Sequence, residues 1–95
     1  MSKPHKPLLF YVDDEPRNLT VFEASIPDEW RVKVFDKPLE ALAALEKEEP
    51  CVILTDQRMP GTSGVQFLSL ARQLRPHAIR IIVTGYSDEN LVVES

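Results

Sequence analysis

The sequence has little cysteine and no long apolar run. Its one cysteine, Cys51, cannot form an internal disulfide, and we interpret it as a small apolar residue in a buried strand, which favours a reducing compartment such as the cytoplasm. No apolar stretch approaches the ~20 residues of a membrane-spanning helix. No signal-peptide pattern precedes the first apolar run. We therefore expect neither a disulfide-stabilised scaffold nor a contact with a membrane.

The sequence also lacks a basic run. It has 11 Lys and Arg against 15 Asp and Glu, for a net charge of -4, and its basic residues are not interleaved with aromatic ones. Direct binding of nucleic acid by this segment is therefore not expected. With 43% hydrophobic and 27% charged residues and no repeat or low-complexity tract, residues 1–95 are predicted to form one globular domain.

Short apolar runs alternate with helical patterns along the chain. Strands are predicted at 8–12, 30–35, 51–54 and 80–83, and helices begin near Pro16, near Pro38 and after Ser63, where proline and serine suit a first turn or a cap. The start of a further helix is predicted after Ser87. Strands that alternate with helices over short connections predict an α/β fold, a doubly wound parallel sheet with right-handed crossovers.

The third helix has the clearest start signal. Ser63 and Gln66 have the spacing of a capping box, in which each side chain accepts a hydrogen bond from the backbone of the other residue. Apolar residues at helical spacing then predict the buried face of this helix: Phe67, Leu68, Ala71 and Leu74.

Polar side chains follow three of the predicted strands, at the point where each strand ends. Asp13 and Asp14 follow the first strand, Asp56 follows the strand at 51–54, and Thr84 follows the strand at 80–83. Because the carboxyl ends of parallel strands share one edge of a sheet, these residues are expected to converge there.

Crowded carboxylates repel one another unless a cation compensates their charge. Oxygen ligands favour Mg²⁺, and an aspartate at the end of a rigid strand is a candidate nucleophile that becomes an aspartyl phosphate. The hydroxyl of Thr84 would donate to a phosphoryl oxygen. A simpler alternative stays open, in which Asp56 caps a turn, Asp13 and Asp14 cap the first helix, and Thr84 only ends a strand.

Three motifs together carry a family resemblance: Val12-Asp13-Asp14-Glu15, Asp56-Gln57-Arg58-Met59-Pro60-Gly61 and Val83-Thr84-Gly85. In this order and spacing they resemble the receiver domain of bacterial two-component response regulators, over the chain from Leu8 to its end. The resemblance implies a flavodoxin-like sheet with the strand order 2-1-3-4.

The resemblance also implies roles for individual residues. Asp56 would accept a phosphoryl group from a histidine kinase or a phosphotransfer protein, and Thr84 would be the switch hydroxyl. Asp14, Asp56 and the backbone carbonyl of Arg58 would bind Mg²⁺, while Asp13 would hold a metal-bound water. These roles describe a regulatory phospho-acceptor, not an enzyme that acts on an external substrate.

The chain departs from the resembled family near its end. Family members continue into a fifth strand, which carries a phosphate-pairing lysine, and a last helix, whereas no lysine here follows residue 47. We therefore expect a fragment, a receiver domain incomplete at its C-terminus. Without a fifth strand, the strand at 80–83 would be an exposed edge, and we expect homo-oligomers that bury Ile81, Ile82 and Val83.

Two other functions were weighed. A Mg²⁺-dependent phosphohydrolase would use the same aspartate, but the second acid or base that such enzymes often carry two positions later is replaced here by Arg58. A degenerate dimerisation module would use the fold without chemistry, and the missing lysine supports it.

Overall fold

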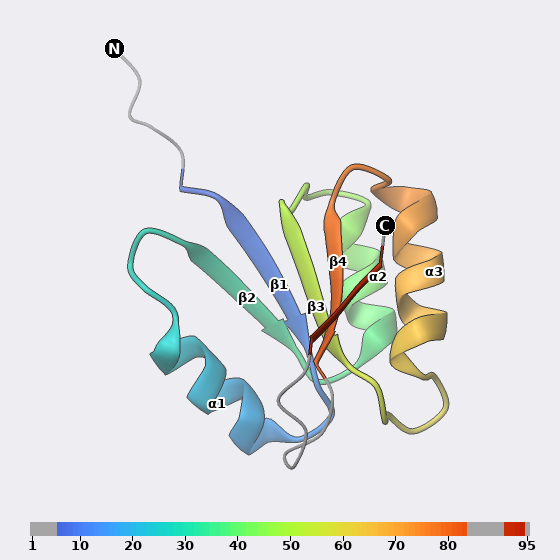
Figure 1. Cartoon of the computed structure of the whole chain (residues 1–95), viewed down its shortest axis with the longest axis horizontal. Helices are drawn as coiled ribbons and strands as arrows, with labels where there is room; N and C mark the ends of the chain where they lie inside the picture. Colours follow the sequence, from blue (N-terminus) through green and yellow to red (C-terminus); the bar gives the residue numbers. More distant parts are fainter. Residues whose placement is uncertain (1–5, 84–90, 95) are drawn as a thin grey trace.

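A computed structural model of the chain describes residues 6–83 and the backbone of 91–94. Strands and helices alternate along most of the sequence (Figure 1). The elements are β1 (Leu8–Val12), α1 (Pro16–Ser25), β2 (Arg31–Phe35), α2 (Pro38–Leu45), β3 (Val52–Asp56), α3 (Gly64–Leu74), β4 (Ile79–Val83) and β5 (Leu91–Glu94).

The strands form one sheet in the order β2-β1-β3-β4-β5. The first four strands are parallel, and β1 lies between β2 and β3, with Phe10 opposite Lys33 on one side and opposite Ile53 on the other. The predicted parallel order 2-1-3-4 is therefore confirmed. Each connection between these parallel strands contains a helix, as a crossover between parallel strands requires.

The C-terminal segment differs from the prediction. Residues 91–94, which we expected in a helix, form β5 and pair antiparallel with β4, with Val93 opposite Ile81. The hypothesis that 80–83 is an exposed edge is therefore wrong, and it no longer supports oligomers through that edge. The physical reason is that a strand of the same chain satisfies the edge backbone groups, and Val92 and Val93 favour extended structure.

One face of the sheet is sealed by α2 and α3. Phe10, Ile53 and Phe67 are fully buried in its centre. We call this the sealed face, and its cluster of buried side chains is Leu8, Phe10, Val12, Ala41, Leu45, Ile53, Met59, Phe67, Leu68, Ala71, Ala78 and Ile82.

The opposite face is covered less completely, and we call it the half-covered face. Among residues 6–83, the helical side chains packed there come from α1. Its buried members are Leu9, Tyr11 and Leu19, with partly buried apolar residues around them: Phe22, Trp30, Val32, Val34, Val52, Leu54 and Val83. The strand at 51–54, which we expected to be buried, is therefore only partly buried on this side, at Val52 and Leu54.

Local sequence signals agree with α3 and disagree at Cys51. The capping box of Ser63 and Gln66 is present, and Phe67, Leu68 and Ala71 are buried as predicted, whereas Leu74 at the end of the helix is 37% exposed. Cys51 is exposed and precedes β3, so it is not the buried residue that we expected. Within the described residues, no helix has the length and apolar character needed to cross a membrane.

Candidate functional site

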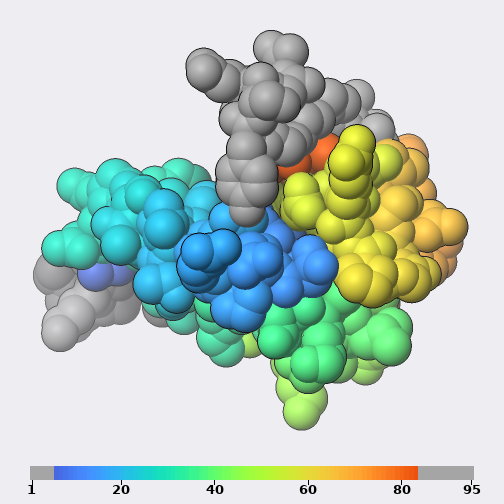
Figure 2. Space-filling view, turned by 90° about the horizontal axis from the view of Figure 1, so that it is seen from below, coloured from blue at the N-terminus to red at the C-terminus, as the bar shows by residue number. Residues whose placement is uncertain are grey.

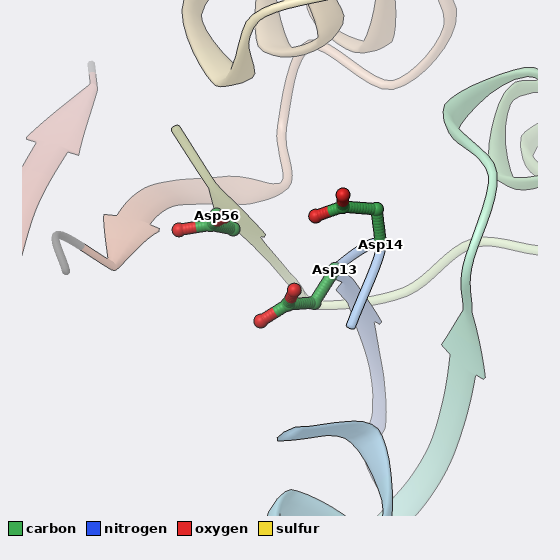
Figure 3. Close-up of side chains that lie close together, drawn as sticks. All are labelled: Asp13, Asp14 and Asp56. Atoms are coloured by element: carbon green, nitrogen blue, oxygen red, sulfur yellow. The ribbon is translucent and has the colours of Figure 1, made fainter. Parts of the chain in front are cut away.

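Three carboxylates meet at the carboxyl edge of the sheet. Asp13 and Asp14 follow β1, and Asp56 ends β3, the parallel neighbour of β1. One oxygen from each lies within 4.8 Å of the others. Figure 2 looks onto this edge and shows the segment after β1 (blue) beside the segment after β3 (yellow), and Figure 3 shows the three side chains gathered between the two strand ends. The predicted convergence of these aspartates is thus observed.

Asp13 is the most firmly held of the three. It is 2% exposed, and three donors reach its carboxylate. The hydroxyl of Tyr11 donates to Oδ2 over 2.7 Å, the Nδ2 of Asn18 donates to the same oxygen over 2.9 Å, and the backbone N–H of Glu15 donates to Oδ1 over 3.0 Å. The orientation of this carboxylate is therefore fixed by β1 and the start of α1.

The surroundings of Asp56 disfavour the ionised form of its carboxylate. Burial raises its pKa above the ordinary value, and the negative charges of Asp13 and, less strongly, Asp14 raise it further. Hydrogen bonds from the backbone of Gln57 and Arg58 act in the opposite direction and lower the pKa. The net shift is upward, because neighbouring negative charge and lost hydration both disfavour the ionised form.

The segment after Asp56 is fastened to the first turn of α3. The backbone carbonyl of Gln57 accepts from the N–H of Gly64 over 2.9 Å, and its side-chain Oε1 accepts from the N–H of Val65 over 3.1 Å. A methyl group on Gly64 would lie 2.5 Å from the backbone oxygen of Asp56, so only glycine permits this approach. Gly61 turns the loop between them with φ +80°.

Buried side chains of the sealed face hold the backbone of Asp56 in place. Thr55 is fully buried, and its hydroxyl donates to the backbone oxygen of Asp56 over 2.9 Å and contacts the Sδ of Met59 at 3.8 Å. Met59 belongs to the core cluster of that face. The strand end that carries Asp56 is therefore held in place by packed side chains.

The structure describes the other predicted site residues less completely. Arg58 is exposed, two positions after Asp56 in the loop. Thr84, the predicted switch hydroxyl, and Gly85 lie outside the described residues. The roles assigned to Arg58 and Thr84 stay predictions.

Tyr11 and Gln57 are functional candidates that sequence reasoning missed. Tyr11 lies within an apolar run, which predicts only a strand. Asp13 follows it by two positions, however, and this spacing places both side chains on the same side of an extended chain, a signal that could have indicated the contact. Gln57 is a polar residue in a loop with no motif of its own, and its contact depends on how α3 docks.

The donor set suits a hard divalent cation. Three carboxylates provide only oxygen ligands, and Mg²⁺ in proteins takes one or two carboxylates while keeping other positions for water or phosphate oxygens. The exposed Asp14 and the partly exposed Asp56 leave the cluster open to solvent. The residues present therefore fit such an ion.

Comparison with known proteins gives a consistent result. The family model for the response regulator receiver domain matches residues 9–95. The hydrogenase transcriptional regulatory protein HoxA of Cupriavidus necator is 39% identical over 82 residues, which are 86% of this chain and 17% of that protein. The DNA-binding transcriptional regulator NtrC of Salmonella typhimurium is 33% identical over 89 residues, 93% of this chain and 19% of that protein. The chain thus spans less than a fifth of these relatives.

Solved structures agree on the fold. The crystal structure of a CheY-like response regulator receiver domain protein from Methanospirillum hungatei has a TM-score of 0.80 at 29% identity, covering 88% of this chain and 68% of that one. A structure described as adenylate cyclase from Rhodopirellula baltica has a TM-score of 0.80 at 28% identity, covering 88% of this chain and 63% of that one. The same backbone therefore occurs in proteins with different printed descriptions.

Proposed function

Because this chain belongs to the response regulator receiver domain family, we propose that Asp56 is its phospho-acceptor and that the donor is a phosphohistidine of a histidine kinase or a phosphotransfer protein. The observation that carries the proposal is the gathering of Asp13, Asp14 and Asp56 within 4.8 Å at the carboxyl edge. We also propose that residues 1–95 act as a single receiver unit.

Asp13, Asp14, Asp56 and the backbone carbonyl of Arg58 would hold a Mg²⁺ ion. Bound there, the ion would neutralise negative charge on the cluster and on the incoming phosphoryl group. The pKa of Asp56 is raised first by burial and then by the negative charges of Asp13 and Asp14. This supports the assignment, because a bound cation would favour the ionised carboxylate.

The transfer itself is a displacement at phosphorus. A carboxylate oxygen of Asp56 forms the new O–P bond as the N–P bond of the donor breaks, and the imidazole nitrogen keeps the electron pair. Tyr11, Asn18 and the N–H of Glu15 hold the Asp13 carboxylate, which would help to bind the ion. Thr84 would donate its hydroxyl proton to a phosphoryl oxygen.

The phosphoryl group would act as a signal through its charge. It adds nearly two negative charges at neutral pH, beside a loop that is fastened to α3 through Gln57. A partner that distinguishes the two states of this surface would read the signal. That the segment itself makes no direct contact with nucleic acid remains a prediction.

The test is phosphorylation with a small donor. With Mg²⁺ and phosphoramidate, the chain should gain one phosphoryl mass in a base-labile form, and Asp56→Asn should abolish the gain. Asp28→Asn changes an exposed aspartate that is far from Asp56 in the sequence. This variant is the matched control, and it should be labelled to the same extent as the parent chain. Labelling that survives Asp56→Asn would contradict the assignment.

The same assay separates the alternatives. A receiver domain consumes about one donor per chain and then stops or hydrolyses its own phosphate, whereas a phosphohydrolase releases phosphate steadily from an added phosphomonoester. A degenerate dimerisation module would neither bind Mg²⁺ nor accept phosphate.

A further inference from the structure

We propose that Tyr11 is a positioning residue for the acidic cluster. Its hydroxyl and the amide of Asn18 hold Oδ2 of the Asp13 carboxylate, so that Oδ1, which accepts from the N–H of Glu15, keeps one position that a cation or its water would occupy. This inference rests on the proposed Mg²⁺-dependent function and names two residues that the family motifs do not include.

The hydrogen bond from Tyr11 is buried and short. Tyr11 is 6% exposed and lies on β1, two residues before Asp13, and its hydroxyl is 2.7 Å from Oδ2. A hydrogen bond to an ionised carboxylate is roughly twice as strong as one between neutral groups. The hydroxyl is thus placed where it can hold a charged group against rotation.

Tyr11 is itself fixed by the half-covered face. Its ring packs on the ring of Phe22 from α1, with centroids 4.3 Å apart, and Leu19 of the same helix belongs to the same buried cluster. The ring of Tyr11 is therefore supported by α1, whereas its hydrogen bond to Asp13 spans only two residues at the end of β1.

Among the described residues, the hydrogen bonds to Asp13 leave one acceptor position of its carboxylate unoccupied. A carboxylate has about four lone-pair positions, two on each oxygen. Tyr11 and Asn18 occupy both positions on Oδ2 of Asp13, and the N–H of Glu15 occupies one on Oδ1. The remaining position on Oδ1 is available for a cation or its water. Loss of the Tyr11 hydroxyl would free one position on Oδ2 and leave the Asn18 amide to hold that oxygen, so the carboxylate would rotate more easily.

The experiment compares Tyr11→Phe with Phe22→Leu. Tyr11→Phe keeps the ring but removes the donor, whereas Phe22→Leu loosens the ring packing but keeps the donor. Mg²⁺ affinity is measured by calorimetry, and phosphorylation is followed against Mg²⁺ concentration. Exchange of the Glu15 amide proton is measured by NMR without metal, and urea unfolding verifies that each variant is folded.

Tyr11→Phe should weaken Mg²⁺ binding about tenfold, the lower end of the range for groups that orient metal ligands. The phosphorylation rate at saturating Mg²⁺ should stay within about twofold of the parent, since Asp56 is untouched. The Glu15 amide should exchange faster in the metal-free variant. Phe22→Leu should lower stability and leave Mg²⁺ affinity within about twofold.

A second comparison tests whether Tyr11 acts through Asp13. In an Asp13→Asn background, adding Tyr11→Phe should cause no further loss of Mg²⁺ affinity. A further loss there, or a folded Tyr11→Phe variant with the parent's Mg²⁺ affinity and amide exchange, would overturn the positioning role while leaving Asp56 as the acceptor. If the parent chain neither binds Mg²⁺ nor accepts phosphate, the proposed function and this inference both fail.

Discussion

The two faces of the sheet differ in how completely they are covered, although the same strands form both. On the sealed face, side chains such as Phe10 and Phe67 have no exposed surface, and two helices pack over them. On the half-covered face, α1 contributes the helical contacts within residues 6–83, and Val52 and Leu54 stay partly exposed. The difference is visible in Figure 1, where α2 and α3 lie together on one side of the sheet and α1 lies apart.

The comparison shows that the faces support different parts of the acidic site. The sealed face fixes Asp56, through Thr55 and Met59 and through the docking of α3. The half-covered face fixes Asp13, through Tyr11 and Asn18. The proposed acceptor Asp56 and the separately held Asp13 therefore meet at one edge, supported from opposite sides of the sheet.

The largest effect is expected from removing a leucine side chain on each face. Leu45→Ala on the sealed face should lower the free energy of unfolding by about 3 to 4 kcal/mol, because Leu45 has no exposed surface and the cavity cannot be filled by water. Leu54→Ala on the half-covered face should cost about 1 to 2 kcal/mol, because a partly exposed side chain buries less apolar surface when the chain folds.

Urea unfolding of both variants measures this difference. Equal losses would show that the half-covered face is as well packed in solution as the sealed one, and the comparison between the faces would then fail.

A methyl group at Gly64 should be the next most damaging change. Gly64→Ala would place a carbon atom 2.5 Å from the backbone oxygen of Asp56 and 3.0 Å from the Cα of Gln57, so we expect a loss of about 2 to 3 kcal/mol in unfolding free energy. Phosphorylation should slow as well, because the strand end that carries Asp56 must shift.

Gly61→Ala is the matched control for this prediction. No atom lies within 4 Å of its added methyl group, but its φ of +80° disfavours alanine, which costs about 1 kcal/mol. If Gly61→Ala slowed phosphorylation as much as Gly64→Ala, contact with Asp56 would not be the cause.

The cap of α3 should contribute less than the close approach at Gly64. Ser63→Ala removes the side chain that accepts from the N–H of Gln66, and we expect a loss of about 1 kcal/mol. Ser69→Ala, at an exposed position of the same helix, should change stability by no more than about 0.5 kcal/mol. Thermal unfolding measures the loss of stability in both variants. Equal losses would show that the Ser63 cap has no role in docking α3.

Asp56→Asn should stabilise the metal-free fold at neutral pH. The folded-state pKa of Asp56 lies above its ordinary value, so the ionised carboxylate disfavours folding above that pKa. The gain in the variant should disappear as the pH falls below the unfolded value of about 3.9, where the side chain is neutral in both states. Urea unfolding with a chelator from neutral to acid pH measures it, with Asp28→Asn as the control.

A variant that is less stable than the parent at neutral pH would contradict the raised pKa. Added Mg²⁺ should reduce the advantage of the variant, because the cation compensates the charge that destabilises the parent chain.

Much of the fold could be predicted because its signals are local. The apolar runs at 8–12 and 80–83, the prolines at the starts of α1 and α2, and the Ser63 and Gln66 pair each act within a few residues. The convergence of Asp13 and Asp56 also followed, since parallel strands place their carboxyl ends at one edge. These predictions needed no knowledge of side-chain packing.

The predictions that were wrong depend on distant parts of the chain. Residues 91–94 were expected in a helix from the cap-like sequence before them, but pairing with β4 favours the extended form. Cys51 was expected in a buried strand, but β3 begins one residue later. Tertiary contacts decide such cases, because local preferences amount to less than the energy of strand pairing and packing.

The amino-acid sequence by itself determined the strand and helix order as far as β4, the parallel arrangement of β1 to β4 and the three aspartates at one edge, because hydrophobic periodicity and chain connectivity are properties of the sequence. Only the tertiary structure decided that residues 91–94 pair with β4, that Gln57 fastens the loop to α3, and that one face is sealed while the other is partly open. Those features depend on the distances between elements far apart along the chain, which are fixed only when the helices dock on the sheet.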